Sequence, residues 1–439
     1  MQNILNLSRY NILTSTEAEH DYHIEAETAE PAVICRSCGS EDVLGGGRQE
    51  ILIKDLPMHG KRVGIYVKAR RYRCRDCGKT HTELLPDVID GQRMTVRLYH
   101  WICQQSVCRT FTSIAHDVGV SEGTVRGIFN EYVAQLEKKF EFVTPEWMGL
   151  DEIHIIKKPR CVITNIESNT VVNILPERTK AVVFNHLMKM KNRKTIKCVA
   201  MDMWQPYRDA VYGSIDGVSI VVDKFHVLRM ANQSLDTVRK GIRDGLTTKQ
   251  RRGLMHDRFI LLKRDPELQP MERITLESWT RNFPALGEAY AAKERFFDFY
   301  EAMSVSEAET AYRRWEDDLH DSIRDAYKPL TTAMTNWRTE IMNYFEHPVT
   351  NAFTECVNGL IRVINRCGRG YSFEALRAKI LFSAGAHKVV RPKFQRRCTD
   401  SYERVTTFSY GLPTYEQQET KNYGIDVSTL ERLIETGKF

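Results

Sequence analysis

An isolated carboxylate interrupts the apolar pattern of residues 351–370, "NAFTECVNGLIRVINRCGRG". Glu355 lies among apolar residues that recur at helical spacing. These residues are Phe353, Val357, Leu360, Ile361 and Ile364. A charge beside a packed face costs free energy unless a cation or a hydrogen-bond network meets it. The sequence therefore predicts a partner for Glu355.

Two aspartates are candidates for the same site. Asp151 lies in "MGLDEIHIIKK", and Asp202 ends the nearly all-apolar run "IKCVAMDMW". Three convergent carboxylates would repel one another, whereas two divalent ions about 4 Å apart would hold all three ionised. Carboxylate oxygens suit Mg²⁺ or Mn²⁺ rather than zinc. Asp151, Asp202 and Glu355 are thus the expected catalytic and metal-binding residues of a phosphoryl transfer, in which one ion activates the attacking oxygen and the other stabilises the leaving oxygen.

The elements that must position these acids form an α/β domain. Three short β-branched runs, "MGLDEIHIIKK", "RCVITNIES" and "VVNILPER", predict an antiparallel meander, and a helix, a strand, a helix and a strand follow. This order is typical of an RNase H-like fold, in which the strands of Asp151 and Asp202 are neighbours and a later helix packs across their carboxyl ends. Helical patterns over about residues 225–345 predict an all-α insertion before the helix of Glu355.

Four cysteines form two pairs of identical spacing. Cys35 and Cys38 lie in "CRSCG", and Cys74 and Cys77 lie in "CRDCG". Zinc prefers four thiolates in a tetrahedron, and the glycine after each pair permits a tight turn. The runs between the pairs alternate apolar and basic residues as half-buried strands do, which predicts a zinc ribbon. A thioredoxin-like redox site, the alternative, requires a single such motif within a βαβ pattern.

The second of these runs gives residues 54–79 a local positive charge. Between the lysines at its two ends, this segment carries seven lysines and arginines against Asp55 and Asp76. Neutralising phosphates releases counterions, so the segment suits a polyanion, although a solvated surface would have the same composition. The expected DNA contacts here are Arg70, Arg71 and Arg73.

A helix-turn-helix pattern follows in "FTSIAHDVGVSEGTVRGIFNEYV", residues 111–133. Ala115 is small enough for two helices to cross, Gly119 ends the first helix, and Ser121 is an N-cap for the second. The second helix of such a unit enters the major groove of DNA, whereas an αα-hairpin inside a bundle would be the structural alternative. The residues expected to face DNA are Ser121, Glu122, Arg126 and Asn130.

Composition sets limits on the class of protein. The chain has 439 residues, of which 42% are hydrophobic, and a formal charge of +6, which suggests several domains with real cores. Its eleven cysteines are an odd number and it has no export signal, which argues against a disulfide framework. No run approaches the ~18 apolar residues that cross a bilayer. We expect a cytoplasmic, nucleoid-associated protein without membrane contact.

The chain is expected to divide into seven segments. They are an N-terminal arm (1–30), a zinc ribbon (31–86), a helix-turn-helix domain (87–144), the first part of the RNase H-like core (145–246), an all-helical insertion (247–348), the last part of the core (349–395) and a C-terminal tail (396–439). The polar, turn-rich tail would order on a partner subunit or on DNA.

These motifs together resemble bacterial insertion-sequence transposases of the ISL-three (ISL3) family, which have a DDE catalytic core. The resemblance extends from the zinc ribbon through "GLDE", "AMDMWQPYRDAV", "VVDKFHVLR" and "TNAFTECVNGLIRVINRCGRGYSFEALR", which is most of the chain. It implies Asp151, Asp202 and Glu355 as the catalytic positions. It also places Asp223 and His226 of "DKFH" near the site as supporting residues, where a structural pair at a helix start is the alternative. A homodimer in a synaptic complex is implied, because two DNA ends must be processed together.

Polar residues around Glu355 are interpreted from their spacing. Asn351 and Asn358 lie four residues before and three residues after it, on one helix face, where they would orient the carboxylate, contact DNA or act as surface caps. Arg362 and Arg366 would suit phosphates, and simple solvation is the alternative.

Two classes of function follow. The first is a DNA transposase that binds its terminal inverted repeats, cuts DNA with Mg²⁺ or Mn²⁺, joins it to target DNA and contains structural Zn²⁺. The second is a catalytically silent DNA-binding regulator derived from a transposase. Three convergent carboxylates favour the enzyme, because a binding module has no need of them. A plain nuclease would leave the two DNA-reading modules unexplained.

Overall fold

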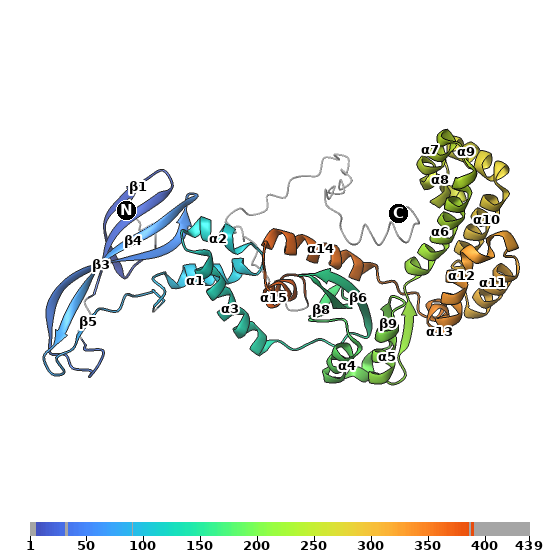
Figure 1. The fold of residues 1–439 in the computed structure, drawn as a ribbon. Helices are drawn as coiled ribbons and strands as arrows, with labels where there is room; N and C mark the ends of the chain where they lie inside the picture. The colour runs from blue at the N-terminus through green and yellow to red at the C-terminus, as the bar shows by residue number, and fades with distance from the viewer. Residues whose placement is uncertain (1–5, 31–33, 90, 386–387, 390–439) are drawn as a thin grey trace, which may run out of the picture. The chain divides into compact units, whose positions relative to one another are not determined.

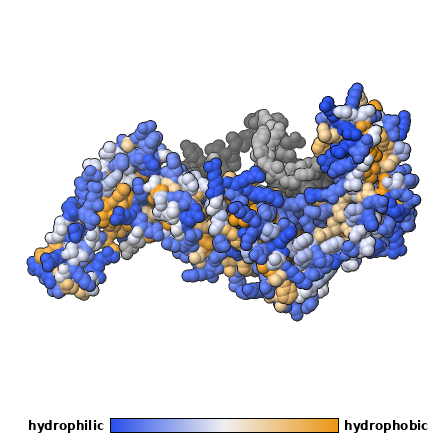
Figure 2. Space-filling model, viewed as in Figure 1, coloured by the Kyte–Doolittle hydropathy of each residue, from blue (hydrophilic) through white to orange (hydrophobic). Residues whose placement is uncertain are grey.

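The computed structural model describes residues 6–30, 34–89, 91–385 and 388–389 (Figure 1). The expected C-terminal tail, residues 396–439, lies outside the described residues. In the described part of the chain, no helix is long and apolar enough to cross a membrane. Hydrophilic residues cover most of the face seen in Figure 2, with scattered hydrophobic patches between them.

The N-terminal sheet contains the expected ribbon hairpin and two strands that were not expected. Its order is β1-β2-β4-β3, and β5 pairs with the end of β4. Residues 1–30 were expected to form an arm; instead residues 10–28 form an antiparallel hairpin whose second strand pairs in parallel with β4. This sheet consists of β1 (Tyr10–Glu17), β2 (Asp21–Thr28), β3 (Val43–Met58), β4 (Lys61–Cys74) and β5 (Thr80–Thr82).

Three helices form the helix-turn-helix unit: α1 (Val96–Ser106), α2 (Phe111–Val118) and α3 (Glu122–Lys139). The side chains of Thr95, Thr110 and Ser121 cap them by accepting a backbone N–H of the first turn. Gly119 ends α2 at a φ of +70°, a left-handed conformation that favours glycine, and so allows the sharp turn into α3.

A second sheet lies at the centre of the chain, in the order β10-β9-β6-β7-β8. Strands β6 (Trp147–Ile155), β7 (Lys158–Asn165) and β8 (Thr170–Leu175) form the expected antiparallel meander. Strand β9 (Cys198–Met201) runs parallel to β6, and β10 (Ser219–Val222) runs parallel to β9. Helices α4 (Lys180–Lys189) and α5 (Gln205–Ser214) connect the later strands.

Most of the described residues after β10 form helices. They are α6 (Lys224–Gly241), α7 (Thr248–His256), α8 (Arg258–Leu262), α9 (Pro270–Asn282), α10 (Pro284–Phe299), α11 (Val305–Asp317), α12 (Asp321–Asn336), α13 (Arg338–Met342), α14 (Ala352–Gly368) and α15 (Phe373–Ala384). Helices α7 to α13 fall within residues 247–348, where an all-helical insertion is expected.

The two faces of the central sheet belong to different hydrophobic cores. Met148 and Leu150 of β6 pack into a core that also contains side chains of α4, α5 and the insertion. Ile153 and Ile155 of the same strand point to the other face, where α14, α15 and the helix-turn-helix unit share one core. This alternation also directs Asp151 toward α14.

Candidate active site and DNA-binding surfaces

Asp151 lies in the middle of β6 and is buried against α14. The side-chain amide of Asn358 donates a hydrogen bond of 2.6 Å to Asp151 Oδ2, and the backbone N–H of Glu152 donates to Oδ1 at 2.6 Å. Burial, and then the negative charges of Asp202 and Glu355, raise the pKa of Asp151 to about 7. The structure therefore brings this carboxylate under the electrostatic influence of the two other predicted acids.

Helix α14 approaches β6 closely enough to fix these positions. Asn351 donates from its side chain to the Leu150 carbonyl at 3.0 Å, and the hydroxyls of Thr164 and Thr354 lie 2.7 Å apart. A Cβ on Gly149 would come within 3.0 Å of both threonine hydroxyls, so a side chain would clash there. Asn351 and Asn358 are both buried, which excludes the surface-cap alternative for them.

Asp202 follows the last residue of β9 and lies near His226 and Asp223, at the start of α6. Because Met201 pairs with Leu150 in the parallel ladder, Asp202 emerges beside the strand of Asp151. His226 Nδ1 lies 3.0 Å from Asp202 Oδ1, and this contact raises the pKa of His226. Fully buried Asp223 caps α6 by accepting the backbone N–H of Phe225 at 3.1 Å.

The acids and His226 face one cavity of about 510 Å³. It is lined by Asp151, Glu152, His154, Asp202, His226, Arg229, Glu355, Asn358 and Arg362. Beside it, Asp223, His226 and Glu355 form a group whose possible ligand atoms all lie within 4.8 Å of one another. Burial raises the pKa of Asp223 to about 6, and its Oδ2 is buried without a hydrogen-bond partner in the described residues. Two carboxylates and an imidazole at this separation, with Asp151 and Asp202 lining the cavity beside them, could hold a divalent cation.

The expected apolar face of α14 needs correction. Val357 and Ile361 are buried, but Leu360 is 43% exposed. Glu355 is itself exposed rather than enclosed by the packed face, and it points to the cavity that it lines. Its carboxylate therefore needs less compensation than the sequence pattern suggested.

The four cysteines predicted to bind zinc come together at one point. The sulfurs of Cys35 and Cys77 lie 3.6 Å apart, as do those of Cys38 and Cys74. A tetrahedron with Zn–S bonds of about 2.3 Å has sulfurs about 3.8 Å apart, so the arrangement fits zinc. The backbone N–H of Ser37 lies 3.4 Å from Cys35 Sγ and lowers the pKa of that thiol, which favours the metal-binding thiolate.

The predicted DNA-facing residues of α3 occupy its exposed side. Ser121 is the N-cap, and its hydroxyl lies 2.8 Å from that of Thr124. Arg126 forms an ion pair with Glu122 at 2.7 Å, so these two side chains partly neutralise each other. Asn130 is exposed one turn further along the helix.

Three family models match separate regions of the chain. A family model described as a transposase, of the ISL3 DDE type, matches residues 148–380, which is more than half of the chain. The chain belongs to the ISL3 family of transposases. Models for the zinc-finger of transposases IS204/IS1001/IS1096/IS1165 and for the helix-turn-helix domain of transposase family ISL3 match residues 31–77 and 83–133.

A relative of this transposase is found in Bordetella parapertussis. The transposase for insertion sequence element IS1001 is 23% identical over 346 residues, which cover 77% of the chain and 85% of the relative. The region matched by the DDE model contains Asp151, Asp202 and Glu355.

Much of the basic segment in the transposase's ribbon is paired with acids from β1 and β2. Ion pairs join Lys61 to Glu17 at 2.5 Å, Arg62 to Asp21 at 2.7 Å and Lys68 to Glu25 at 2.8 Å. Arg70, a predicted DNA contact, bonds to Thr28 and lies 3.8 Å from Glu83. Among the described residues, the other predicted contacts, Arg71 and Arg73, are exposed and have no ion-pair partner.

Sequence reasoning missed several residues of the transposase that surround the acids. Arg229 of α6 lines the same cavity as the predicted Arg362. Trp204, two residues after Asp202, is 38% exposed, and the Arg178 guanidinium lies 4.4 Å from the centre of its ring. Arg178 also forms an ion pair with Glu152.

Proposed function

We propose that this protein is a DNA transposase that binds the terminal inverted repeats of its insertion sequence, cleaves DNA strands there and transfers them to target DNA. The convergence of Asp151, Asp202 and Glu355 on one cavity, from β6, the end of β9 and α14, carries the proposal. A regulator without catalytic activity would gain nothing from a cluster that costs free energy through burial and like-charge repulsion.

The catalytic domain is proposed to have an RNase H-like fold. Three antiparallel strands followed by two strands parallel to the first, with helices between them, support this assignment. The insertion of α7 to α13 before α14 supports a core that is split in the sequence. Residues 145–246 and 349–395 would be the two parts of this core. The zinc ribbon (31–86) and the helix-turn-helix domain (87–144) would be the DNA-binding modules that precede it.

Asp151, Asp202 and Glu355 would hold Mg²⁺ or Mn²⁺. When bound, these ions supply the charge that lowers the pKa of the attacking water or 3′-hydroxyl and stabilises the leaving oxygen. Asn358 orients the carboxylate of Asp151, and Asn351 keeps α14 against β6. Asp223 and His226 support Asp202 from the start of α6.

The zinc ribbon and the helix-turn-helix unit would recognise double-stranded DNA. Arg71 and Arg73 are free to contact phosphates, whereas Arg126 must leave Glu122 to contact a base or a phosphate. Arg362 and Arg366 would bind the phosphates next to the bond that is cut. Because two transposon ends must be joined together, a homodimer on the DNA of the nucleoid is the proposed working form.

A cleavage and joining assay tests the proposal. DNA from both sides of the protein's own gene would be incubated with Mg²⁺ or Mn²⁺ and wild-type protein, Glu355→Gln or the control Glu374→Gln, which alters an exposed carboxylate on α15. We expect metal-dependent cuts at the gene's flanks with the wild type and the control, and a loss of about a thousandfold or more with Glu355→Gln. Binding to the flanks without any cut, in all three proteins, would establish the regulator instead.

A further inference from the structure

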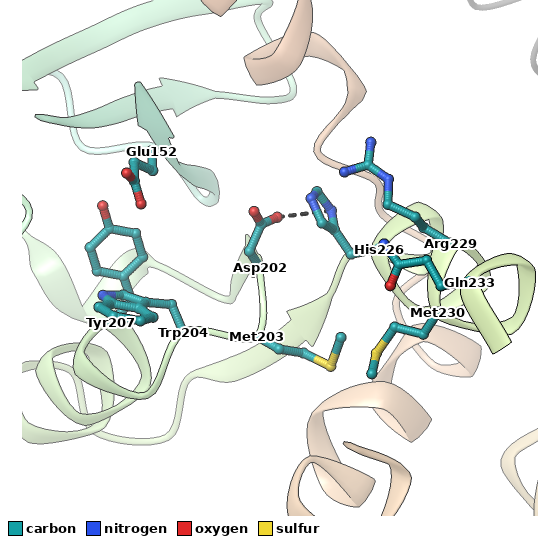
Figure 3. A pocket seen from close by; sticks show the side chains of 9 residues that line it. All are labelled: Glu152, Asp202, Met203, Trp204, Tyr207, His226, Arg229, Met230 and Gln233. Carbon is teal, nitrogen blue, oxygen red and sulfur yellow. Dashed lines mark ion pairs between the residues drawn. The ribbon is translucent and has the colours of Figure 1, made fainter. Parts of the chain in front are cut away.

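A second cavity adjoins the cluster of Asp151, Asp202 and Glu355, here called the acid cluster, and no role has been given to it above. It has a volume of about 350 Å³ and is lined by Glu152, Asp202, Met203, Trp204, Tyr207, His226, Arg229, Met230 and Gln233 (Figure 3). Four of these residues, Glu152, Asp202, His226 and Arg229, also line the cavity of the acid cluster. The volume falls within the range of roughly 300–1,000 Å³ that holds small organic groups in proteins.

One side of this cavity is aromatic and apolar. Trp204 and Tyr207 lie together there, and the Met203 thioether extends below Asp202 (Figure 3). Trp204 is 38% exposed, so part of its ring is free to meet a ligand. Arg178 stacks on Trp204 at 4.4 Å and is held by its ion pair with Glu152, which fixes the orientation of the ring.

The opposite side is one face of α6. His226, Arg229, Met230 and Gln233 follow one another at intervals of three, one and three residues and point into the cavity (Figure 3). Arg229 and Gln233 are exposed. No ion pair or hydrogen bond joins the Arg229 guanidinium to any described residue, so its charge is available to an anion.

We propose that this cavity binds a single unpaired nucleotide of the DNA strand that runs through the acid cluster, next to the bond that is cut. The base would lie against Trp204, Met203 and Met230, and the amide of Gln233 would contact its edge. Arg229, at the boundary of both cavities, would bind the adjoining phosphate. This inference rests on the proposed transposase function, because the acid cluster defines where the cut strand lies.

Charge and shape together select this occupant. Asp202 and Glu152 would repel a phosphate deep in the cavity, whereas a neutral base with amino or imide groups can approach carboxylates. Rings and thioethers bind the face of a base, and such stacking tolerates any base. A base inside a duplex cannot enter, so the nucleotide must be flipped out or belong to a single strand.

Fluorescence of 2-aminopurine in a short single-stranded oligonucleotide provides the first test. The full-length protein, with its zinc retained, would bind it without added Mg²⁺ or Mn²⁺, so no cleavage is needed. We expect wild type to quench the probe, and Trp204→Ala to lose the quenching and to bind roughly fivefold to a hundredfold more weakly, with Trp204→Phe intermediate. Gln233→Ala should weaken binding, while the control Gln205→Ala, next to Trp204 but outside the cavity lining, should match wild type.

Arg229→Ala adds an independent measurement, because removing one phosphate contact should reduce the dependence of log K on log salt by about one charge. Equal quenching and affinity in wild type, Trp204→Ala and Gln233→Ala would overturn the proposal. Failure of wild type to bind the single strand would overturn it as well, and this result does not depend on finding the transposon ends.

Cleavage of DNA ends separates this proposal from the proposed function. An abasic nucleotide would be placed at each position around the cut site. At one position, loss of the base should slow wild type to the rate of Trp204→Ala and should leave Trp204→Ala itself unchanged. Absence of any cut by wild type would contradict the transposase function. Cuts that are equally fast in wild type and Trp204→Ala at every position would contradict the nucleotide site alone.

Discussion

At the scale of single residues, Gly149 determines how closely α14 approaches β6. The hydrogen bonds from Asn351 to the Leu150 carbonyl and from Asn358 to Asp151 form because nothing projects from Gly149 between the helix and the strand. The position of Glu355 on the same helix depends on this contact. The absence of a side chain at Gly149 therefore lets α14 place the exposed Glu355 near the buried Asp151.

Gly149→Ala tests this dependence. The new methyl group would lie within 3.0 Å of the hydroxyls of Thr164 and Thr354, so we expect the free energy of unfolding to fall by about 1–3 kcal/mol and cleavage to slow as α14 moves. Gly359→Ala is the control, because its Cβ would meet nothing within 4 Å and should raise helix stability by about 0.5–1 kcal/mol. Thermal unfolding of wild type and both variants measures the effect. Equal unfolding midpoints for wild type and Gly149→Ala would contradict the close approach of α14 to β6.

At the scale of secondary-structure elements, the β1–β2 hairpin changes the meaning of the basic strand β4. Six acids and no lysine or arginine occur in residues 10–30, and the hairpin faces the basic residues that would otherwise bind DNA. Only the cysteine end of β4, with Arg71 and Arg73, continues beyond this pairing. The ribbon therefore presents its unpaired positive charge close to the zinc site, where the metal would hold the two cysteine pairs together.

Removal of one zinc ligand tests this arrangement. Cys74→Ser should reduce the zinc content from one ion per chain toward none, because three thiolates and a serine hydroxyl bind the ion far more weakly. The DNA affinity should fall with it as Arg71 and Arg73 lose their fixed positions. Elemental analysis measures the zinc, with Cys108→Ser, which alters an exposed cysteine outside the cluster, as the control. Full zinc content in Cys74→Ser would contradict the four-thiolate site.

Local pattern made some of these elements predictable. The meander, β9, α5 and the two helices of the helix-turn-helix unit follow from residues close in sequence, and the structure has them where the pattern indicates. Asp151 and Asp202 could be paired in advance because the predicted fold makes their two strands neighbours in the sheet. The two cysteine pairs were predictable from chemistry, since four thiolates seek one ion.

Non-local pairing explains what the sequence did not reveal. Strand β2 aligns with β4 through pairs such as Asp21 with Arg62, 41 residues apart, and no local rule predicts such a parallel contact. For the same reason, the sequence did not show that acids of β1 and β2 neutralise part of the positive charge of residues 54–79. Leu360 fits the apolar spacing of α14, yet it is 43% exposed, because spacing alone does not show which positions the neighbouring elements cover. The cavity beside Trp204 combines β6, the end of β9 and α6, so only the fold assembles it.

At the scale of the whole molecule, α15 connects the helix-turn-helix unit to the central sheet. Lys379 of α15 is buried among the rings of Phe111, Phe129 and Tyr371, with its Nζ 4.3, 5.1 and 4.9 Å from their centres. The Nζ group donates to the carbonyls of Ser106 and, at 2.8 Å, Arg109, at the turn between α1 and α2. The helix-turn-helix unit thus shares a core with the sheet that carries Asp151.

The pH dependence of stability reports on this junction. Burial lowers the pKa of Lys379 to about 7, whereas a lysine in an unfolded chain titrates near about 10.4. Between these values the unfolded state binds more protons, so the contribution of Lys379 makes the protein more stable as the pH rises from about 7 to about 10. A Coulombic interaction with Cys108 opposes this lowering of the Lys379 pKa.

Lys379→Met should therefore flatten this rise. Methionine preserves the volume and the contact with the three rings but carries no proton, so the difference in thermal midpoint between wild type and Lys379→Met should change steadily from pH 7 to pH 9.5. Calorimetry at several pH values measures it. Lys138→Met, which alters an exposed lysine on α3, should follow wild type throughout. Parallel curves for wild type and Lys379→Met would mean that the hydrogen bonds to the two carbonyls keep the ammonium charged at every pH, and that the junction is held by a permanent cation rather than by a lysine that titrates.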